Sequence, residues 1–280
     1  LIPPSNPMIL YGVVANVSIT SLFMAGIIPG MVVGLMLILT AYGLARRAGY
    51  KASDRRYTSR EFVACFRRSF WSLMSPVIVL GGIYGGIFTP VEASCVAVVY
   101  AIVIGGLVNR KLKWQDFVDC VNNTNLVVST MVVVVGVSVL FGRFLTMYQV
   151  PQKATMVLLG LTDDPYTVLY LIITFLFVLG MFMDTLATIV ILGPILLPVI
   201  THFGIDPVFF GVLWVMANEI ALLSPPLGPN VFIAMNLTGI SLERASKAII
   251  PYTLVLAATI FFMVRFGEDL ILFLPRLFGR

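Results

Sequence analysis

Long apolar segments separated by short polar stretches dominate this chain. Met24–Arg46, Leu126–Met147 and Ala245–Phe266 each suit a single bilayer crossing, because a spanning helix needs about 20 mostly apolar residues. Ser72–Val108 and Tyr166–Ile200 are equally apolar but too long for one span. The pattern therefore predicts an all-α, polytopic membrane protein built as a helical bundle.

One apolar stretch, Glu219–Asn236, is broken in its middle by S-P-P-L-G-P-N, residues 224–230. Each proline removes a backbone donor and pushes the preceding residue toward extended geometry. Broken backbone at membrane depth is tolerated only where protein buries it or where it lines a wet cavity. We therefore predict a re-entrant helical hairpin, with Val208–Leu223 as its incoming arm.

The same pattern occurs a second time at the start of the chain. A shift of 222 positions places Pro3, Pro4 and Pro7 on Pro225, Pro226 and Pro229, and places Ile27-Ile28-Pro29 on Ile249-Ile250-Pro251. The alternative is two unrelated proline kinks in a helix bundle. Paired interrupted segments in two halves are typical of inverted repeats in secondary transporters, so we expect two re-entrant hairpins.

Two further breaks interrupt the overlong segments. Gly81–Glu92 contains four glycines, a proline and an acid, and Gly180–Thr185 places Asp184 in mid-segment. Both predict discontinuous helices. Basic residues flank the first break on both sides, which leaves open whether Ser72–Val108 crosses the bilayer once or twice.

Ser59–Trp71 is predicted as an amphipathic surface helix, because phenylalanines recur there every four residues with arginines between them. Trp114–Asn125 is predicted as a second surface helix. The first hairpin lacks an incoming arm before Leu1, so we expect a C-terminal part of a longer protein. We expect its single transporter domain to contain a first hairpin arm (1–22), a spanning helix and cytoplasmic loop (24–58), interfacial helices and a broken helix (59–124), spanning helices (125–206), a second hairpin (207–240) and a terminal helix (241–280).

Composition supports a membrane location. Hydrophobic residues make up 59% of the chain and charged residues 11%, whereas soluble domains carry about 25% charged residues. The net charge of +5 does not indicate nucleic-acid binding, because the bases cluster at membrane edges. Eight of them lie in one connection, which the positive-inside rule places in the cytoplasm: Arg46, Arg47, Lys51, Arg55, Arg56, Arg60, Arg67 and Arg68.

Few ionisable residues lie deep in the apolar segments, and such residues are functional candidates by default. Asp184 is beside Thr185 and Thr188, and together they offer oxygens to a sodium ion; the alternative is a structural hydrogen bond between helices. Glu92 follows a Thr-Pro break and can cap the next helix instead. A packing or hinge role suits Glu219 as well as ligation does.

Polar residues at the tips allow two interpretations. Ser5, Asn6, Ser224 and Asn230 can cap broken helix ends, and a cap can also bind an ion. Arg143 can meet a substrate carboxylate or extend to the membrane interface. The chain has one histidine and no hydrolase or nucleotide-binding motif, so we expect a protein that is not an enzyme and that draws on an ion gradient or another subunit.

Together these segments resemble the large membrane subunit of the tripartite ATP-independent periplasmic (TRAP) transporters, the DctM-like family. The resembling segments are I-P-P-S-N-P-M-I-L-Y-G (2–12), A-G-I-I-P-G (25–30), G-G-I-Y-G-G-I-F-T-P-V-E-A (81–93), F-G-R-F-L-T (141–146), G-M-F-M-D-T-L-A (180–187), G-I-D-P-V-F-F-G-V (204–212) and S-P-P-L-G-P-N-V-F-I-A (224–234). The second tip departs from the family's T-P-P-V-G-L-N, although Ser224 keeps a hydroxyl.

The resemblance implies an elevator transporter of the bacterial inner membrane that imports an organic acid, such as sialic acid or a C4-dicarboxylate, with sodium as coupling ion and no other cofactor. It implies a periplasmic binding protein and a small, DctQ-like membrane subunit as partners. The implied sodium ligands are Ser5, Asn6, Gly86, Thr89, Glu92, Asp184, Thr185, Thr188, Ser224 and Asn230. The implied substrate contacts are Ser5, Pro226, Gly228 and Arg143. The alternatives are a stand-alone ion-coupled carboxylate or anion permease and, less in keeping with the single histidine, an intramembrane enzyme.

Overall fold

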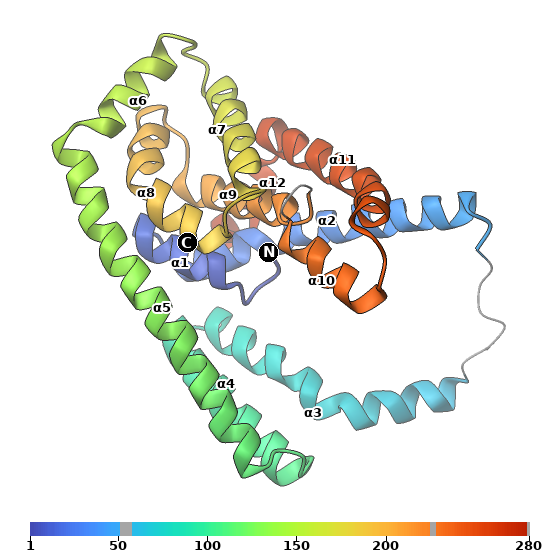
Figure 1. Cartoon of the computed structure of the whole chain (residues 1–280). Coiled ribbons are helices and arrows are strands. Elements are labelled where there is room, and N and C mark those ends of the chain that lie inside the picture. The colour runs from blue at the N-terminus through green and yellow to red at the C-terminus, as the bar shows by residue number, and fades with distance from the viewer. Residues whose placement is uncertain (51–57, 225–227, 279–280) are drawn as a thin grey trace. The chain divides into compact units, whose positions relative to one another are not determined.

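The computed structural model describes residues 1–50, 58–224 and 228–278, which form helices and their connections without strands in these ranges (Figure 1). The chain divides into two compact units, Leu1–Ala48 with Val134–Arg280 (unit 1) and Gly49–Val133 (unit 2). Each unit is described by itself.

Unit 1 contains the helices that carry most of the predicted site. They are α1 (Asn6–Ala15), α2 (Ile19–Arg47), α6 (Val150–Leu159), α7 (Pro165–Gly180), α8 (Thr185–His202), α9 (Pro207–Ala221), α10 (Pro229–Thr238), α11 (Leu242–Phe266) and α12 (Glu268–Leu277). Unit 2 contains α3 (Ser59–Tyr84), α4 (Pro90–Val103), a π-helical turn (Ile104–Val108) and the first part of α5 (Trp114–Met147).

The core of unit 1 is built around α9, whose residues from Phe209 to Asn218 are all buried. This helix packs against α7, α11, α2, α1 and α8. Trp214 lies at its centre with its ring edge-on to Tyr11 and Phe210. Gly211 makes room for the Tyr11 ring, since a Cβ there would overlap it. The Tyr11 hydroxyl donates to the carbonyl of Pro207 at 2.7 Å, which ties α1 to the start of α9.

The internal repeat has a counterpart in the helices. Both α1 and α10 are ten residues long and begin directly after the proline-rich tips. Each ends at a left-handed residue, Asn16 with φ 54° and Gly239 with φ 71°. The long helices that follow, α2 and α11, contain Pro29 and Pro251 and pack against each other.

The predicted break at Gly81–Glu92 is confirmed, and it answers the question of how Ser72–Val108 is folded. α3 ends at Tyr84 and α4 begins at Pro90, with Gly86 at φ 70° in the turn between them. The Tyr100 hydroxyl of α4 donates to the carbonyl of Trp71 in α3 at 2.6 Å. The two helices therefore form a hairpin, and the basic residues on both sides of the break belong to its open end.

Two predicted surface helices are wrong as separate elements. Ser59–Trp71 continues without interruption to Tyr84 in the 26-residue α3, and Trp114–Asn125 continues into Leu126–Met147 in the 34-residue α5. The composition changes at both junctions, but neither junction contains a glycine or proline that would stop the backbone hydrogen bonding. The predicted break between Gly180 and Thr185 is confirmed by the end of α7 and the start of α8.

Within the described residues, five helical stretches are long and apolar enough to cross a membrane: Ile19–Arg47, Ser59–Tyr84, Pro90–Val108, Thr185–His202 and Leu242–Phe266. Shorter apolar helices, α1, α7 and α9, accompany them. The expected polytopic, all-helical membrane fold is confirmed.

Candidate functional site

The first tip presents a buried hydroxyl at the start of a helix. Leu1–Pro4 lies against α2, where a Cβ at Gly26 would be 2.9 Å from the Leu1 carbonyl oxygen and a Cβ at Gly30 2.7 Å from Ile2. Ser5 then occupies the N-cap position of α1 and is 5% exposed. Its Oγ has no hydrogen-bond partner among the described residues. A buried polar atom of this kind usually has a partner, so its isolation marks a place for one.

The start of α8 brings two buried threonines together. Thr185 is 2% exposed and Thr188 is completely buried. The Thr188 hydroxyl donates to the carbonyl of Thr185 at 2.8 Å. Asp184 is exposed at the N-cap, where its carboxylate accepts the backbone N–H of Leu186 at 2.9 Å. The Asp184 carboxylate therefore caps the first turn of α8, and the two threonines lie in the interior.

Two polar residues of α9 complete this cluster. Asn218 was not a candidate, and for Glu219 ligation and a packing or hinge role were alternatives. Asn218 is completely buried and lies 2.5 Å from the Thr188 hydroxyl. Glu219 is half-buried and accepts the Thr185 hydroxyl at 3.4 Å. A signal for both was present, since they are the only polar side chains in an otherwise apolar 15-residue helix.

The start of α8 and the end of α9 form one polar region through the Thr185–Glu219 and Thr188–Asn218 contacts. Helix α1, which begins directly after Ser5, packs against both of these helices. We define the tip cluster as these residues: Ser5, Thr185, Thr188, Asn218 and Glu219.

The second tip is held by close backbone contacts. Ser224 is 1% exposed, and its hydroxyl donates to the carbonyl of Ile220 at 3.1 Å. Gly228 donates its N–H to the Ser224 carbonyl at 3.1 Å and serves as N-cap of α10. A Cβ at Gly228 would be 2.7 Å from the carbonyl oxygens of Leu222 and Ser224, so the turn requires glycine. The predicted substrate contact Pro226 lies outside the described residues.

Two of the predicted tip residues are exposed. Asn6 occupies the first position of α1, and Asn230 lies in the first turn of α10. Neither helix has an acidic residue in its first turn. The free N–H groups and the positive end of each helix dipole are therefore not offset by a neighbouring carboxylate.

Three candidates belong to unit 2. Glu92 accepts the backbone N–H of Thr89 at 2.8 Å and its hydroxyl at 2.9 Å, forming a capping box at the start of α4. Gly86 lies in the turn that precedes it. Glu92 therefore caps the start of α4 together with Thr89, which was the alternative to ion binding considered for this residue.

Arg143 lies in a pocket of its own, of about 780 Å³. Its side chain shares the pocket with Thr146 of α5, Val13 and Val14 of α1, and Pro194 of α8. The tip cluster does not contribute to this lining. The structure therefore groups Arg143 with the far end of α1 and separates it from Ser5 and Gly228.

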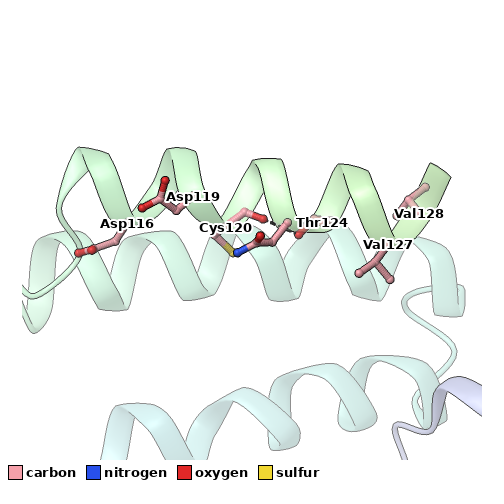
Figure 2. Close-up of a pocket in the computed structure, with 7 residues that line it drawn as sticks. Asp116, Asp119, Cys120, Thr124, Val127 and Val128 are labelled. Atoms are coloured by element: carbon pink, nitrogen blue, oxygen red, sulfur yellow. Dashed lines mark hydrogen bonds between the residues drawn. The ribbon is translucent and has the colours of Figure 1, made fainter. Parts of the chain in front are cut away.

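A second depression, of about 590 Å³, lies on the first half of α5 and contains none of the candidates (Figure 2). Asp116, Asp119, Cys120, Thr124, Val127 and Val128 follow one face of this single helix. Asp116 caps the helix by accepting the N–H of Lys113 at 3.0 Å. Because none of the candidate residues lines this depression, we assign no site to it.

Comparison with known proteins agrees with the resemblance seen in the sequence. Residues 1–266 match the model of a family described as the tripartite ATP-independent periplasmic transporter, DctM component. Over 260 residues the chain is 40% identical to the isethionate TRAP transporter permease protein DctMQ of Oleidesulfovibrio alaskensis, covering 93% of this chain and 41% of that protein.

Two other relatives give the same picture. The chain is 36% identical over 281 residues to the sialic acid TRAP transporter large permease protein SiaM of Vibrio cholerae, covering 99% of this chain and 65% of that protein. It is 34% identical over 256 residues to the C4-dicarboxylate TRAP transporter large permease protein DctM of Pseudomonas aeruginosa, covering 91% and 60%. The chain thus spans between two-fifths and two-thirds of their lengths. Their family consists of inner-membrane transport proteins and not of enzymes, and this chain belongs to it as a DctM component of the TRAP transporters.

Proposed function

We propose that this chain forms the C-terminal part of a large TRAP permease that imports an organic anion together with sodium. The observation that carries the proposal is the Ser5 hydroxyl, which is buried and unpartnered among the described residues at the start of a proline-broken helix. Such a position offers an oxygen to a cation and backbone N–H groups to an anion.

The cation site of this proposal is at the start of α8. The Thr185 hydroxyl and the Glu219 carboxylate supply oxygens from two helices. The buried contact between Thr188 and Asn218 holds those helices in register. Among the sequence candidates, Ser5 and Ser224 remain the tip hydroxyls proposed as further ligands. Asp184 caps α8, and its proposed contribution is to fix the loop carbonyls before Thr185.

The anion site of this proposal lies at the N-termini of α1 and α10. Ser5 and Gly228 are the residues from which these helices start, and neither first turn contains an acid. Helix N-termini of this kind favour anionic groups through aligned N–H donors. The relatives named above are described as transporters of isethionate, sialic acid and C4-dicarboxylates, which all carry an anionic group. We extend that class, an organic anion, to this chain.

Three further parts of the proposal rest on family membership. A periplasmic binding protein delivers the substrate, and a small DctQ-like membrane subunit accompanies the permease, in keeping with the tripartite family name. Transport follows an elevator movement of the part that carries the two tips. Gly86, Thr89 and Glu92 remain proposed sodium ligands only if the capping box at α4 opens during that movement.

Sodium-dependent uptake tests the proposal in proteoliposomes that contain the full-length permease, its small subunit and its binding protein. We expect Ser5→Ala to reduce uptake at limiting sodium by at least about tenfold, the scale of one lost ligand oxygen of about 1.5 kcal/mol. Thr174→Val is the matched control, because the Thr174 hydroxyl only donates to the carbonyl of Tyr170 within α7.

Two results would contradict the proposal. Uptake by Ser5→Ala with unchanged sodium dependence would remove the first tip from the site. Uptake that persists without the binding protein would favour the stand-alone permease.

A further inference from the structure

The first half of α3 carries three arginines around a shallow cleft. Arg60, Arg67 and Arg68 line a depression of about 490 Å³ together with Val63 and Ala64. Arg60 and Arg67 are two helical turns apart on one face, and Ala64 lies between them. Because the Ala64 side chain is small, it leaves space between the arginines. The three guanidinium groups therefore border one depression that a small anionic group can enter.

The other side of this helix is aromatic. Phe62, Phe66 and Phe70 recur every four residues and are 70%, 51% and 37% exposed. The rings of Phe66 and Phe70 pack edge to face with centroids 6.3 Å apart. A helix with exposed phenylalanines on one side and arginines on the other suits the boundary between headgroups and acyl chains.

The three arginines of the cleft are exposed, and α3 carries a single acid, Glu61, which accepts the backbone N–H of Thr58 at 3.0 Å in a capping box. The first half of α3 therefore carries more basic than acidic residues. The arginines belong to the basic connection that the positive-inside rule places in the cytoplasm, where the membrane surface is anionic.

We propose that this cleft binds the phosphate headgroup of an anionic phospholipid of the cytoplasmic leaflet. Guanidinium groups match phosphate oxygens through paired hydrogen bonds, and three of them border one headgroup-sized space. The phenylalanines insert beside the acyl chains of the same leaflet. The lipid holds the start of α3 at the membrane surface. The proposal concerns unit 2 alone and does not depend on the transported substrate.

Lipid binding is measured by native mass spectrometry of the full-length permease in detergent, titrated with dioleoyl phosphatidylglycerol or with zwitterionic dioleoyl phosphatidylcholine. We expect wild-type permease to bind phosphatidylglycerol preferentially. The triple variant Arg60→Gln, Arg67→Gln, Arg68→Gln should weaken this binding by at least about tenfold, because each base near an anionic lipid surface contributes to binding. The triple lysine variant at the same positions keeps the charge and should lose only part of the affinity.

A charge-matched control removes three bases from the same unit. Arg110→Gln, Lys111→Gln, Lys113→Gln should retain at least half of the phosphatidylglycerol binding. Equal losses in the two glutamine variants would overturn the proposal in favour of general charge attraction. Equal binding of both lipids by wild type, or displacement of the lipid by millimolar inorganic phosphate, would also overturn it. Thermal unfolding of each variant establishes that lost binding is not lost folding.

Discussion

The Asn218 amide and the Thr188 hydroxyl lie 2.5 Å apart where α8 and α9 pack, and both side chains are completely buried. With its amide oxygen toward the Trp214 indole, Asn218 accepts that N–H at 3.1 Å and donates to the Leu176 carbonyl at 3.1 Å. In this orientation the same oxygen accepts the Thr188 hydroxyl, whose hydrogen then points to Asn218 and away from the Thr185 carbonyl. A single amide thereby joins α7, α8 and α9 behind the residues proposed to hold sodium. Buried networks of this kind are costly to leave half satisfied.

Replacement of Asn218 should therefore destabilise unit 1. We expect Asn218→Ala to lower the free energy of unfolding by about 2–3 kcal/mol, because buried partners lose their hydrogen bonds. Thermal unfolding in detergent measures the effect. Asn122→Ala, at an exposed position of α5, is the control and should leave the melting temperature unchanged. A melting temperature equal to that of wild type would show that the network does not stabilise the fold.

Gly180 should tolerate no side chain. A Cβ there would be 2.8 Å from both the Asn218 side-chain amide and the Ala221 Cβ, so alanine must push α7 away from α9. We expect Gly180→Ala to cost about 1–3 kcal/mol of stability, as overpacking usually does. Gly34→Ala is the control, because open space surrounds a Cβ at that position and alanine favours a helix. Equal stability of the two variants would contradict the predicted clash.

Sodium coupling should distinguish the two carboxylates near α8. Glu219→Gln removes the charge that faces Thr185, and we expect the sodium concentration for half-maximal uptake to rise at least about tenfold. Asp184→Asn should change it little, because asparagine caps a helix as well as aspartate does. Uptake in proteoliposomes as a function of sodium measures both. The reverse order of effects would return the ligand role to Asp184.

The stability of the α7 start should depend on pH through Asp164. The hydroxyl and the backbone N–H of Thr167 donate to this carboxylate at 2.7 and 2.9 Å and hold its pKa below the usual range. A lowered pKa in the folded state means that the ionised form stabilises the fold. The contribution is present above the unfolded pKa and disappears as pH falls through the lowered folded value.

We therefore expect Asp164→Ala to melt below wild type at pH 7. The two melting temperatures should converge as the pH is lowered past the ordinary aspartate pKa of about 4. Melting curves between neutral and acidic pH measure the difference. A gap that stays constant over this range would mean that ionisation of Asp164 does not support the helix start.

Breaks in the helices could be predicted from the sequence, because specific residues cause them. Pro3-Pro4 and Pro229 mark the starts of α1 and α10, and Thr89-Pro90 and Asp184 mark those of α4 and α8. Continuity was harder to predict. The change from charged to apolar residues at Trp71 suggested a boundary. The helix α3 nevertheless continues through that position, because its backbone hydrogen bonds do not depend on side-chain polarity.

The site could be predicted only in part. Ser5, Thr185 and Ser224 proved buried, as residues at a tip or break can be. Asn218 stands out as a polar residue in an apolar helix, but its hydrogen-bond partners come from the packing of three helices and could not be read from the sequence. Asp184 is exposed because the cap of α8 uses its carboxylate. Glu219 was recognised as a deep acid, but its contact with the Thr185 hydroxyl depends on the packing of α8 against α9.

The turn at Gly85–Thr89 has a consequence for the residues that follow. Because α4 runs back along α3, Thr58 and Trp114 lie at the open end of one hairpin. A hairpin that enters a bilayer adds no net crossing, so we expect Thr58 and Trp114 on the same face. Lengthening or shortening the hairpin should then alter how deeply it penetrates while leaving the orientation of α5 unchanged.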